Sequence, residues 1–491
     1  MKSKLVQIIE SFSYVGLEIG LFVASIGFLL AIVFSPSLSE KQFRPGLLLS
    51  LAGLFFVLVF TSFSLGHIVF SSNNSPIYLF QGLFVLTKKA ILYKQAITIG
   101  AILLTLHLWS MKYSLPTEFF VLFLATIASM FLLIMANHWL SLYVSIEFVS
   151  ICSYLLVALF RQKVHAEAGI KYLLVGAISS AVMLYGISFL YGFTGQLDFT
   201  ALQQLFSTNQ TTWTHQVALF LSLAGLFFKL SAAPFHTYTP DVYEAIPAPI
   251  ASFLAILPKI ATLFVIQDIL THLAGTFVVA LSVVILLSWI IGNFSALWQK
   301  NTKRMLGYSA IAQSGFILVA LTTSQSSSAE RAIEVYVFTY MFISINAFLL
   351  IDLLARTKNS FELDTFKGGA SSNKMLGVSA VIIAIALIGL PPTIGFTGKL
   401  VVFSSIWEEY MFSGQKVHLV LLLFGLLNAA ISLFYYIKIP YYLIVPESDD
   451  VQKNLSNRFL IAEWYCFSLS VFLVYLFFFP KIIYTWLLFF A

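Results

Sequence analysis

The sequence predicts an all-α polytopic membrane protein with about 14 transmembrane helices. Of its 491 residues, 59% are hydrophobic and only 10% are charged, whereas soluble domains carry roughly a quarter charged residues. Apolar runs of about 20 residues, the length of a helix that crosses a bilayer, recur along the whole chain. This composition excludes a soluble globular protein.

The predicted spans are apolar runs bounded by polar or charged residues. The first follows the polar, basic segment Met1 to Ser13 without a small-residue cleavage site, so we expect a retained anchor helix. In chain order the runs cover about residues 14–34, 46–63, 91–109, 119–136, 138–160, 169–192, 216–233, 249–272, 274–296, 303–323, 329–356, 374–410, 416–437 and 458–479. The stretch 76–86 is too short to span and predicts a hairpin or re-entrant segment outside the membrane.

Prolines are expected to break two of these helices. The run 374–410 is too long for one straight span and contains Pro391 and Pro392, which remove backbone donors near its middle. Pro234 interrupts the seventh helix close to Lys229. Broken helices need polar partners at depth and commonly line cavities in transporters. A simple packing kink explains one proline, but it explains poorly two breaks that each lie near a lysine.

The positions of the two breaks predict an inverted repeat. Helices four to eight carry one break on their fourth member, and helices nine to thirteen carry the other on theirs. Because five is odd, the second unit enters the membrane from the opposite side. The predicted organisation is three N-terminal helices (1–118), a first repeat (119–272), a second, inverted repeat (273–440), and a final helix with its tail (441–491).

The lysines and arginines predict the orientation in the membrane. Both termini share one side, with eight basic residues: Lys2, Lys4, Lys88, Lys89, Lys94, Arg331, Lys416 and Lys481. The opposite side has fifteen: Lys41, Arg44, Lys112, Arg161, Lys163, Lys300, Lys303, Arg304, Arg356, Lys358, Lys367, Lys374, Lys438, Lys453 and Arg458. The positive-inside bias places the fifteen in the cytoplasm and both termini outside, which in a bacterial inner membrane is the periplasmic side.

Four lysines remain within the predicted spans, together with one central carboxylate: Lys171, Lys229, Lys259, Lys399 and Glu147. A charge near the bilayer centre costs about 2.5 to 3.5 kcal/mol and commonly marks an ion or proton pathway. Lys259 and Glu147 lie about ten residues, or roughly 15 Å, from either end of their helices, which is beyond comfortable reach of the membrane surface. We interpret these residues as a proton path, and the alternative for any one lysine is that it snorkels to the membrane surface or closes a static ion pair.

The remaining charged residues carry less weight. Glu147 is the natural partner of Lys229, whereas Lys171 lies near the basic cytoplasmic loop and can snorkel to the surface. His236, with Asp241 and Glu244 after the first break, fits a proton entrance and a hydrogen-bonded turn equally well. Four carboxylates near helix ends are interpreted as solvated or snorkelling: Glu18, Asp268, Asp352 and Glu463.

The chain has no motif of its own for redox or nucleotide chemistry. Cys152 and Cys466 both lie in apolar runs and are not spaced for zinc, haem or an iron–sulfur cluster. No GxGxxG or GxxxxGK[ST] pattern occurs. We expect no cofactor, metal or nucleic acid to bind this chain, so any redox or ATP energy must come from another subunit.

Several motifs resemble the antiporter-like membrane subunits of respiratory complex I. They are Phe228-Lys-Leu-Ser-Ala-Ala-Pro-Phe-His236, Thr239-Pro-Asp-Val-Tyr-Glu244, Lys303-Arg-Met-Leu-Gly-Tyr-Ser-Ala-Ile-Ala-Gln313, Leu390-Pro-Pro-Thr-Ile-Gly-Phe-Thr-Gly-Lys399 and Ala166-Glu-Ala-Gly-Ile-Lys-Tyr172. The likeness runs from about residue 130 to 440, and the Pro-Asp-Val-Tyr-Glu form resembles the N-type branch of bacterial NADH:quinone oxidoreductase. The segment Ala245-Ile-Pro-Ala-Pro249 departs from the usual Gly-Ala-Pro-Thr-Pro.

The resemblance implies a 14-helix subunit with one proton channel and no redox centre. It identifies Glu147 with the family's helix-five glutamate, Lys229 and Lys259 with the lysines of helices seven and eight, and Lys399 with the helix-twelve residue. A lysine at the last position is typical of the N-type, whereas related antiporter subunits usually carry glutamate. The implied partners are other membrane subunits of the complex, and NADH, FMN, iron–sulfur clusters and quinone would bind elsewhere in it.

Two other functions remain open from the sequence. A subunit of a multisubunit cation/proton antiporter would use an ion gradient in place of redox energy, and Lys399 argues against it. A purely structural membrane scaffold would hold its buried charges in fixed pairs, and four separate lysines with one central carboxylate argue against that.

Overall fold

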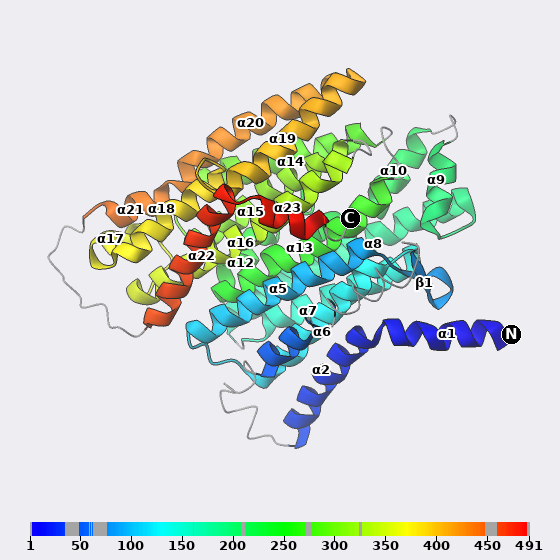
Figure 1. Cartoon of the computed structure of the whole chain (residues 1–491), viewed down its shortest axis with the longest axis horizontal. Helices are drawn as coiled ribbons and strands as arrows, with labels where there is room; N and C mark the ends of the chain where they lie inside the picture. The colour runs from blue at the N-terminus through cyan, green and yellow to red at the C-terminus, as the bar shows by residue number, and fades with distance from the viewer. Residues whose placement is uncertain are drawn as a thin grey trace.

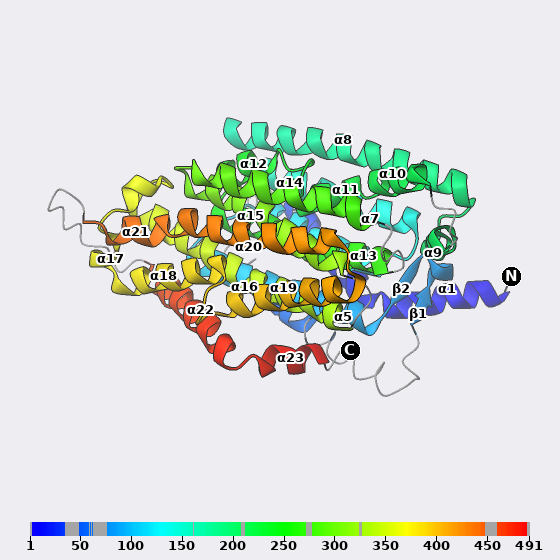
Figure 2. The same cartoon turned by 90° about the horizontal axis from the view of Figure 1, so that it is seen from above.

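The computed structural model describes residues 2–34, 49–57, 59, 61, 76–160, 162–207, 212–271, 277–323, 327–446 and 459–488. In these residues the chain forms a bundle of helices that run roughly along one direction (Figure 1). Seen from above, α8 (Lys163–Thr194) lies along one edge of the bundle and α23 (Lys481–Leu488) along the opposite edge (Figure 2).

The helices before the centre of the chain are α1 (Lys2–Tyr14), α2 (Gly16–Phe34), α5 (Lys88–Ser110), α6 (Thr117–Met135), α7 (Trp139–Ala158), α8, α9 (Phe199–Ser207), α10 (Trp213–Ser222), α11 (Ala224–Leu230), α12 (Thr239–Ala245) and α13 (Ala248–Thr271). Those after it are α14 (Val278–Leu297), α15 (Thr302–Val319), α16 (Ser327–Lys358), α17 (Gly369–Ser372), α18 (Lys374–Ile388), α19 (Ile394–Ser413), α20 (Lys416–Tyr436), α21 (Lys438–Ile444), α22 (Leu460–Phe478) and α23. The described residues also form two short strands, given below, and three 3-10 turns: η1 (Phe80–Gly82), η2 (Ala320–Thr322) and η3 (Leu363–Phe366).

The all-α, multi-pass class is confirmed. Within the described part of the chain, ten helices are long and apolar enough to cross a membrane, or up to twelve if each of two bent pairs counts as one span. The predicted span 46–63 lies partly outside the described residues, with 49–57 helical. The exact number of 14 spans and the inverted repeat stay predictions.

The second predicted break is confirmed at its expected place. Helix α18 ends at Ile388, the residues that follow are not helical, and α19 begins at Ile394. Gly389 caps α18 with a φ of 85°, a backbone conformation that only glycine adopts at no steric cost.

The first break differs in detail from the prediction. Helix α11 ends at Leu230, before Pro234, because Ser231 takes a left-handed conformation with a φ of 60°. The chain between Leu230 and Thr239 is not helical, and a second bend of 48° separates α10 from α11. The hydroxyl of Ser222 bonds the carbonyl of Leu219 at 2.7 Å in the last turn of α10, a local competition with helix bonds that favours bending.

The short apolar stretch forms the predicted hairpin. Strands β1 (Ile77–Leu79) and β2 (Phe84–Leu86) pair antiparallel, with Ile77 opposite Leu86. Helix α1 packs on this hairpin through Phe12, whose ring lies 5.2 Å from that of Phe80. The chain bends by 72° between α1 and α2.

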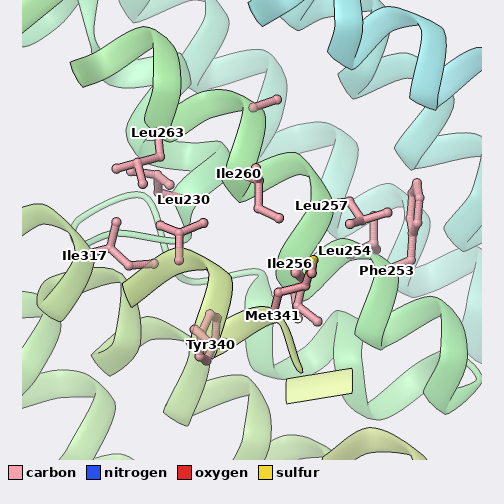
Figure 3. Packing of buried hydrophobic residues seen from close by; sticks show 14 of the residues in the cluster. Leu230, Phe253, Leu254, Ile256, Leu257, Ile260, Leu263, Ile317, Tyr340 and Met341 are labelled. Atoms are coloured by element: carbon pink, nitrogen blue, oxygen red, sulfur yellow. The ribbon is translucent and has the colours of Figure 1, made fainter. Parts of the chain in front are cut away.

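Helix α13 is the centre of the bundle. An apolar stretch of 18 residues in this helix is wholly buried, and the helix packs against α5, α6, α11, α15 and α16. Figure 3 shows Leu257 and Ile260 of this helix, Ile317 of α15 and Met341 of α16, which all belong to one cluster of buried hydrophobic side chains. A lysine in such a helix is far from solvent on every side.

Candidate functional site

Glu147 lies in the middle of α7 and is half-buried. Its Oε1 atom is buried and has no hydrogen-bond partner in the described part of the chain. A buried carboxylate oxygen without a partner is costly, so such a group is seldom retained for stability alone. Lys229, Tyr143 and Tyr154 are within electrostatic reach of this carboxylate.

Lys229 lies one residue before the end of α11 and is only 2% exposed. Its Nζ donates a hydrogen bond to the Tyr172 hydroxyl at 3.2 Å. Three ring centroids surround the same Nζ: Tyr172 at 5.1 Å, Tyr154 at 5.3 Å and Phe228 at 5.5 Å. Among the described residues Lys229 makes no direct ion pair, so the predicted contact with Glu147 is electrostatic and not a salt bridge.

Lys259 follows Pro258 in the middle of α13 and is 2% exposed. Its Nζ donates to the carbonyl of Ala310 and to the hydroxyl of Ser314, each at 2.9 Å. Ser314 also bonds the carbonyl of Leu230, the residue that follows Lys229. Ser314 of α15 therefore contacts both the Lys259 ammonium group and the backbone next to Lys229.

Lys399 lies in the second turn of α19, beside the second break. Its Nζ donates to the carbonyls of Leu387 at 3.2 Å and Ile388 at 2.7 Å, and it lies 4.7 Å from the ring of Phe316. These carbonyls are the last of α18, where the helix dipole is negative and a cation is stabilised.

A small cavity of about 10 Å³ lies between Lys399 and α15, the lower limit for holding one water molecule. Gln313, Tyr336, Thr339 and Tyr340 line it together with Lys399 and several apolar residues. The Tyr336 hydroxyl bonds the side-chain oxygen of Gln313, the neighbour of Ser314. Polar side chains therefore extend from the Lys259 contact to Lys399.

Lys171 reaches solvent, which is the alternative that the sequence left open for it, so it is not one of the buried lysines. Its side chain is 46% exposed and pairs with Glu167 at 2.9 Å and Asp241 at 3.2 Å. Asp241 and Glu244 also both bond Arg304 at 2.7 Å. These residues line a solvent-open pocket between α8, α12 and α15.

His236 lies in the non-helical segment after α11 and is half-buried, with its Nδ1 buried and without a hydrogen-bond partner among the described residues. Burial lowers the pKa of this histidine, which keeps the ring neutral at neutral pH. In the described chain His236 makes no side-chain hydrogen bond or ion pair with Asp241 or Glu244. Those two carboxylates bond Arg304 instead, so the three residues do not form one cluster.

Two buried ionic contacts were missed by the sequence reasoning. Glu18 and Asp352, interpreted as solvated, are each 1% exposed, and Lys94, assigned to a loop, is 3% exposed. Glu18 accepts a hydrogen bond from Lys94 at 2.5 Å, and Asp352 lies 3.0 Å from His107. The signal was the pairing of opposite charges on separate helices, and a single sequence does not show which helices pack together.

The described residues contain no group of three or more His, Cys, Asp and Glu side chains that could hold a metal ion. The fold and the site define a multi-pass membrane protein with protonatable side chains spread through its buried interior. Glu147, Lys229, Lys259 and Lys399 come from α7, α11, α13 and α19, and each of the four can gain and lose a proton.

Comparisons with known proteins agree with this class. Residues 136–427 match a family described as NADH:quinone oxidoreductase/Mrp antiporter, transmembrane. NADH-quinone oxidoreductase subunit N 2 of Chloroherpeton thalassium is 32% identical over 407 residues, which cover 79% of this chain and 78% of the relative.

Two solved structures share the fold. A chain of respiratory complex I from Thermus thermophilus with bound aureothin has a TM-score of 0.76 and 26% identity, covering 94% of this chain and 97% of that one. A chain of the Mrp complex from Dietzia sp. DQ12-45-1b has a TM-score of 0.80 at 17% identity, covering 96% and 95%, a likeness of fold alone. The chain belongs to the NADH:quinone oxidoreductase/Mrp antiporter transmembrane family, as its motifs predicted.

Proposed function

We propose that this chain is a proton-translocating membrane subunit of an NADH:quinone oxidoreductase, of the N type. The observation that carries the proposal is the series Glu147, Lys229, Lys259 and Lys399, whose three lysines are almost fully buried. Ser314 of α15 contacts Lys259 and the backbone beside Lys229, and Gln313 of the same helix lines one cavity with Lys399. Each lysine is held by neutral hydroxyls, carbonyls or rings. Such partners stabilise an ammonium group without a fixed counter-ion, so the proton stays exchangeable.

The roles follow from the contacts of each residue. Glu147 and Lys229 form the first proton-holding pair, Lys259 is the central relay, and Lys399 is the last group of the series. Ser314 connects the first step, because it touches both Lys259 and the end of α11. One water molecule in the cavity beside Gln313 would complete the second step. Lys171 and the charged pocket around Asp241 lie outside this series, and we propose them only as a surface where protons enter.

The energy would come from other subunits. NADH oxidation by FMN and iron–sulfur clusters, and quinone reduction, are proposed for partner subunits of the assembly and not for this chain. We further propose that 119–272 and 273–440 are the two halves of an inverted repeat that meet at Lys259. The proposed location is a bacterial inner membrane, with both termini on the periplasmic side, because the loop cations predicted opposite the termini outnumber those predicted on the same side as the termini.

A subunit of a multisubunit cation/proton antiporter is the second candidate. The fold shared with the Mrp complex and the family description favour it. Lys399 separates the two candidates, because the N-type resemblance expects lysine there and the antiporter subunits usually carry glutamate. A static scaffold is disfavoured by Glu147, whose buried oxygen has no fixed partner among the described residues.

The test is proton pumping by the purified complex in vesicles, measured during NADH-driven quinone reduction. Glu147→Ala and Lys259→Met should assemble but pump about 100-fold less, the usual effect of removing a proton-transfer group. Glu147→Asp should keep part of the activity, because the carboxylate survives. Lys374→Met, an exposed lysine at the start of α18, is the matched control and should pump normally. Normal pumping by assembled Glu147→Ala enzyme would falsify the proposal.

A further inference from the structure

Lys229 is held differently from Lys259 and Lys399. Lys259 and Lys399 each donate two hydrogen bonds, and at least one goes to a backbone carbonyl. In the described chain Lys229 donates only one, to the neutral hydroxyl of Tyr172. The remaining stabilisation of its positive charge comes from aromatic faces.

Three rings from three elements enclose the Lys229 ammonium group, and we name them the aromatic cage: Tyr154 of α7, Tyr172 of α8 and Phe228 of α11. Each centroid lies within about 6 Å of the Nζ, the range of cation–π attraction. The attraction is strongest where water is excluded, and the Lys229 side chain is almost fully buried.

The aromatic cage is built into the packing and is not an accidental cluster. The Tyr154 and Tyr172 rings meet edge to face at 4.7 Å, and Tyr172 stacks on Tyr238 at 4.6 Å. Tyr238 is fixed in turn by a 2.9 Å hydrogen bond to the carbonyl of Phe228. The Tyr154 hydroxyl fits over Gly176 of α8, where any Cβ atom would overlap it.

We propose that the aromatic cage residues Tyr154 and Tyr172 are positioning residues that hold protonated Lys229 apart from Glu147 and release it when it loses its proton. This inference rests on the proposed function. Ring faces attract an ammonium group but not a neutral amine. When the proton passes from Nζ to a carboxylate or a water molecule, the side chain loses its attraction to the rings. Proton release and side-chain movement are therefore linked.

The elements around Lys229 carry the following titratable side chains: Glu147, Cys152 and Tyr154 on α7, Tyr172 on α8, Tyr238 after α11, and Lys259 on α13. Of these, Lys259 donates a hydrogen bond to the Ala310 carbonyl of α15 and not to Lys229 or its cage. Removing a ring leaves all of the carboxylates in place. Tyr154 is within electrostatic reach of Glu147, whereas Glu147 is not among the groups that act on Tyr172, so a shift produced by removing either ring reports on the cage.

The experiment compares pH profiles of proton pumping by the assembled complex. Tyr154→Leu removes one ring, so Lys229 should lose its proton more readily and the alkaline limb should move to lower pH by about one unit. Tyr154→Phe keeps the ring and should restore the profile. Tyr172→Phe removes only the hydrogen bond and should shift the limb by less than Tyr172→Leu. Tyr185→Leu, an exposed tyrosine on α8, is the matched control.

Gly176→Ala keeps every cage side chain but displaces Tyr154, and it should shift the limb in the same direction, which secures the test if Tyr154→Leu fails to assemble. If the alkaline limb of the pH profile is unchanged in both Tyr154→Leu and Gly176→Ala, the proposed role of the aromatic cage is wrong. If it is unchanged while Lys229→Met stops pumping, only the cage fails. If Lys229→Met itself pumps normally, the proposed function fails.

Discussion

At the scale of single residues, Lys229, Lys259 and Lys399 are buried and are held by neutral partners. The sequence predicted that these three are buried, because a charge within an apolar run is visible without a structure, but it missed the buried Lys94 and Lys303. It could not predict the partners of the three lysines. The carbonyls of Leu387 and Ile388 can accept hydrogen bonds from Lys399 only because α18 ends there and leaves them without partners in the helix. The contact of Lys229 with Tyr172 depends on how the helices pack.

Lys399 provides the sharpest residue-scale prediction. Lys399→Met keeps the apolar stem and removes the exchangeable proton, so pumping should fall about 100-fold while packing survives. Arginine should also fail, since its charge is permanent. Glutamate can cycle, and its protonated form can donate one hydrogen bond to the carbonyls of Leu387 or Ile388, so part of the activity should remain. Quinone reduction and membrane energisation, normalised to assembled complex, are the measurements. Pumping by the arginine variant at the lysine level would show that Lys399 is a static charge.

The buried pair of Glu18 and Lys94 predicts a loss of stability without a specific loss of proton transfer. Both side chains are almost fully buried, so Glu18→Gln leaves Lys94 without a counter-ion at a cost of roughly 3–5 kcal/mol. The midpoint of denaturant unfolding should fall, and the double variant Glu18→Gln with Lys94→Met should recover most of it. Glu10→Gln, an exposed glutamate on α1, is the control. Equal stability of Glu18→Gln and Glu10→Gln would contradict the assignment.

At the scale of helices and breaks, hydrophobic runs located most elements and left their ends imprecise. The proline pair predicted the break before α19 correctly, because two residues without an N–H group cannot continue a helix. The bend between α10 and α11 was not predictable from prolines, since none lies at Leu223. Close contact between α8 and α10 at Gly186, where a Cβ atom would overlap the backbone of Ser222, fixes the path of the chain there.

Close packing of α14 on α15 predicts one further effect. A Cβ atom at Gly292 would lie 2.6 Å from the backbone nitrogen of Ala312, and a backbone atom cannot swing away. Gly292→Ala should therefore lower stability by roughly 1–3 kcal/mol and move α15, which carries Ser314. Gly192→Ala has open space on α8 and should be neutral or slightly stabilising. Unfolding midpoints of the two variants test the contrast, and a Gly292→Ala midpoint equal to that of Gly192→Ala would show that α14 and α15 separate easily.

At the scale of the whole molecule, the sequence predicted the membrane class and the family but assigned some charges to the wrong environment. Lys94 and Lys303 were counted as loop cations, yet both are buried, Lys303 with its Nζ 2.8 Å from the carbonyl of Ile246. Lys94 was counted on the side of the termini and Lys303 on the opposite side, so removing both from the count leaves the excess of loop cations opposite the termini unchanged. The predicted orientation therefore keeps its basis, although Lys41, Arg44, Arg161, Lys453 and Arg458 lie outside the described residues.

The orientation can be tested on a single helix. Helix α8 has 32 residues, about 48 Å at 1.5 Å per residue, so both of its ends extend beyond a hydrocarbon core of about 30 Å. Lys163 begins the helix, Gln196 follows it, and both are exposed. In a background without Cys152 and Cys466, Gln196→Cys should react with an impermeant thiol reagent on intact cells. Lys163→Cys should react only after the membrane is opened, because the cation-rich loops face the cytoplasm. The reverse labelling pattern would show that the orientation in the membrane is opposite to the predicted one. The pocket around Lys171 and Asp241 would then face the exterior, and protons would enter there from that side.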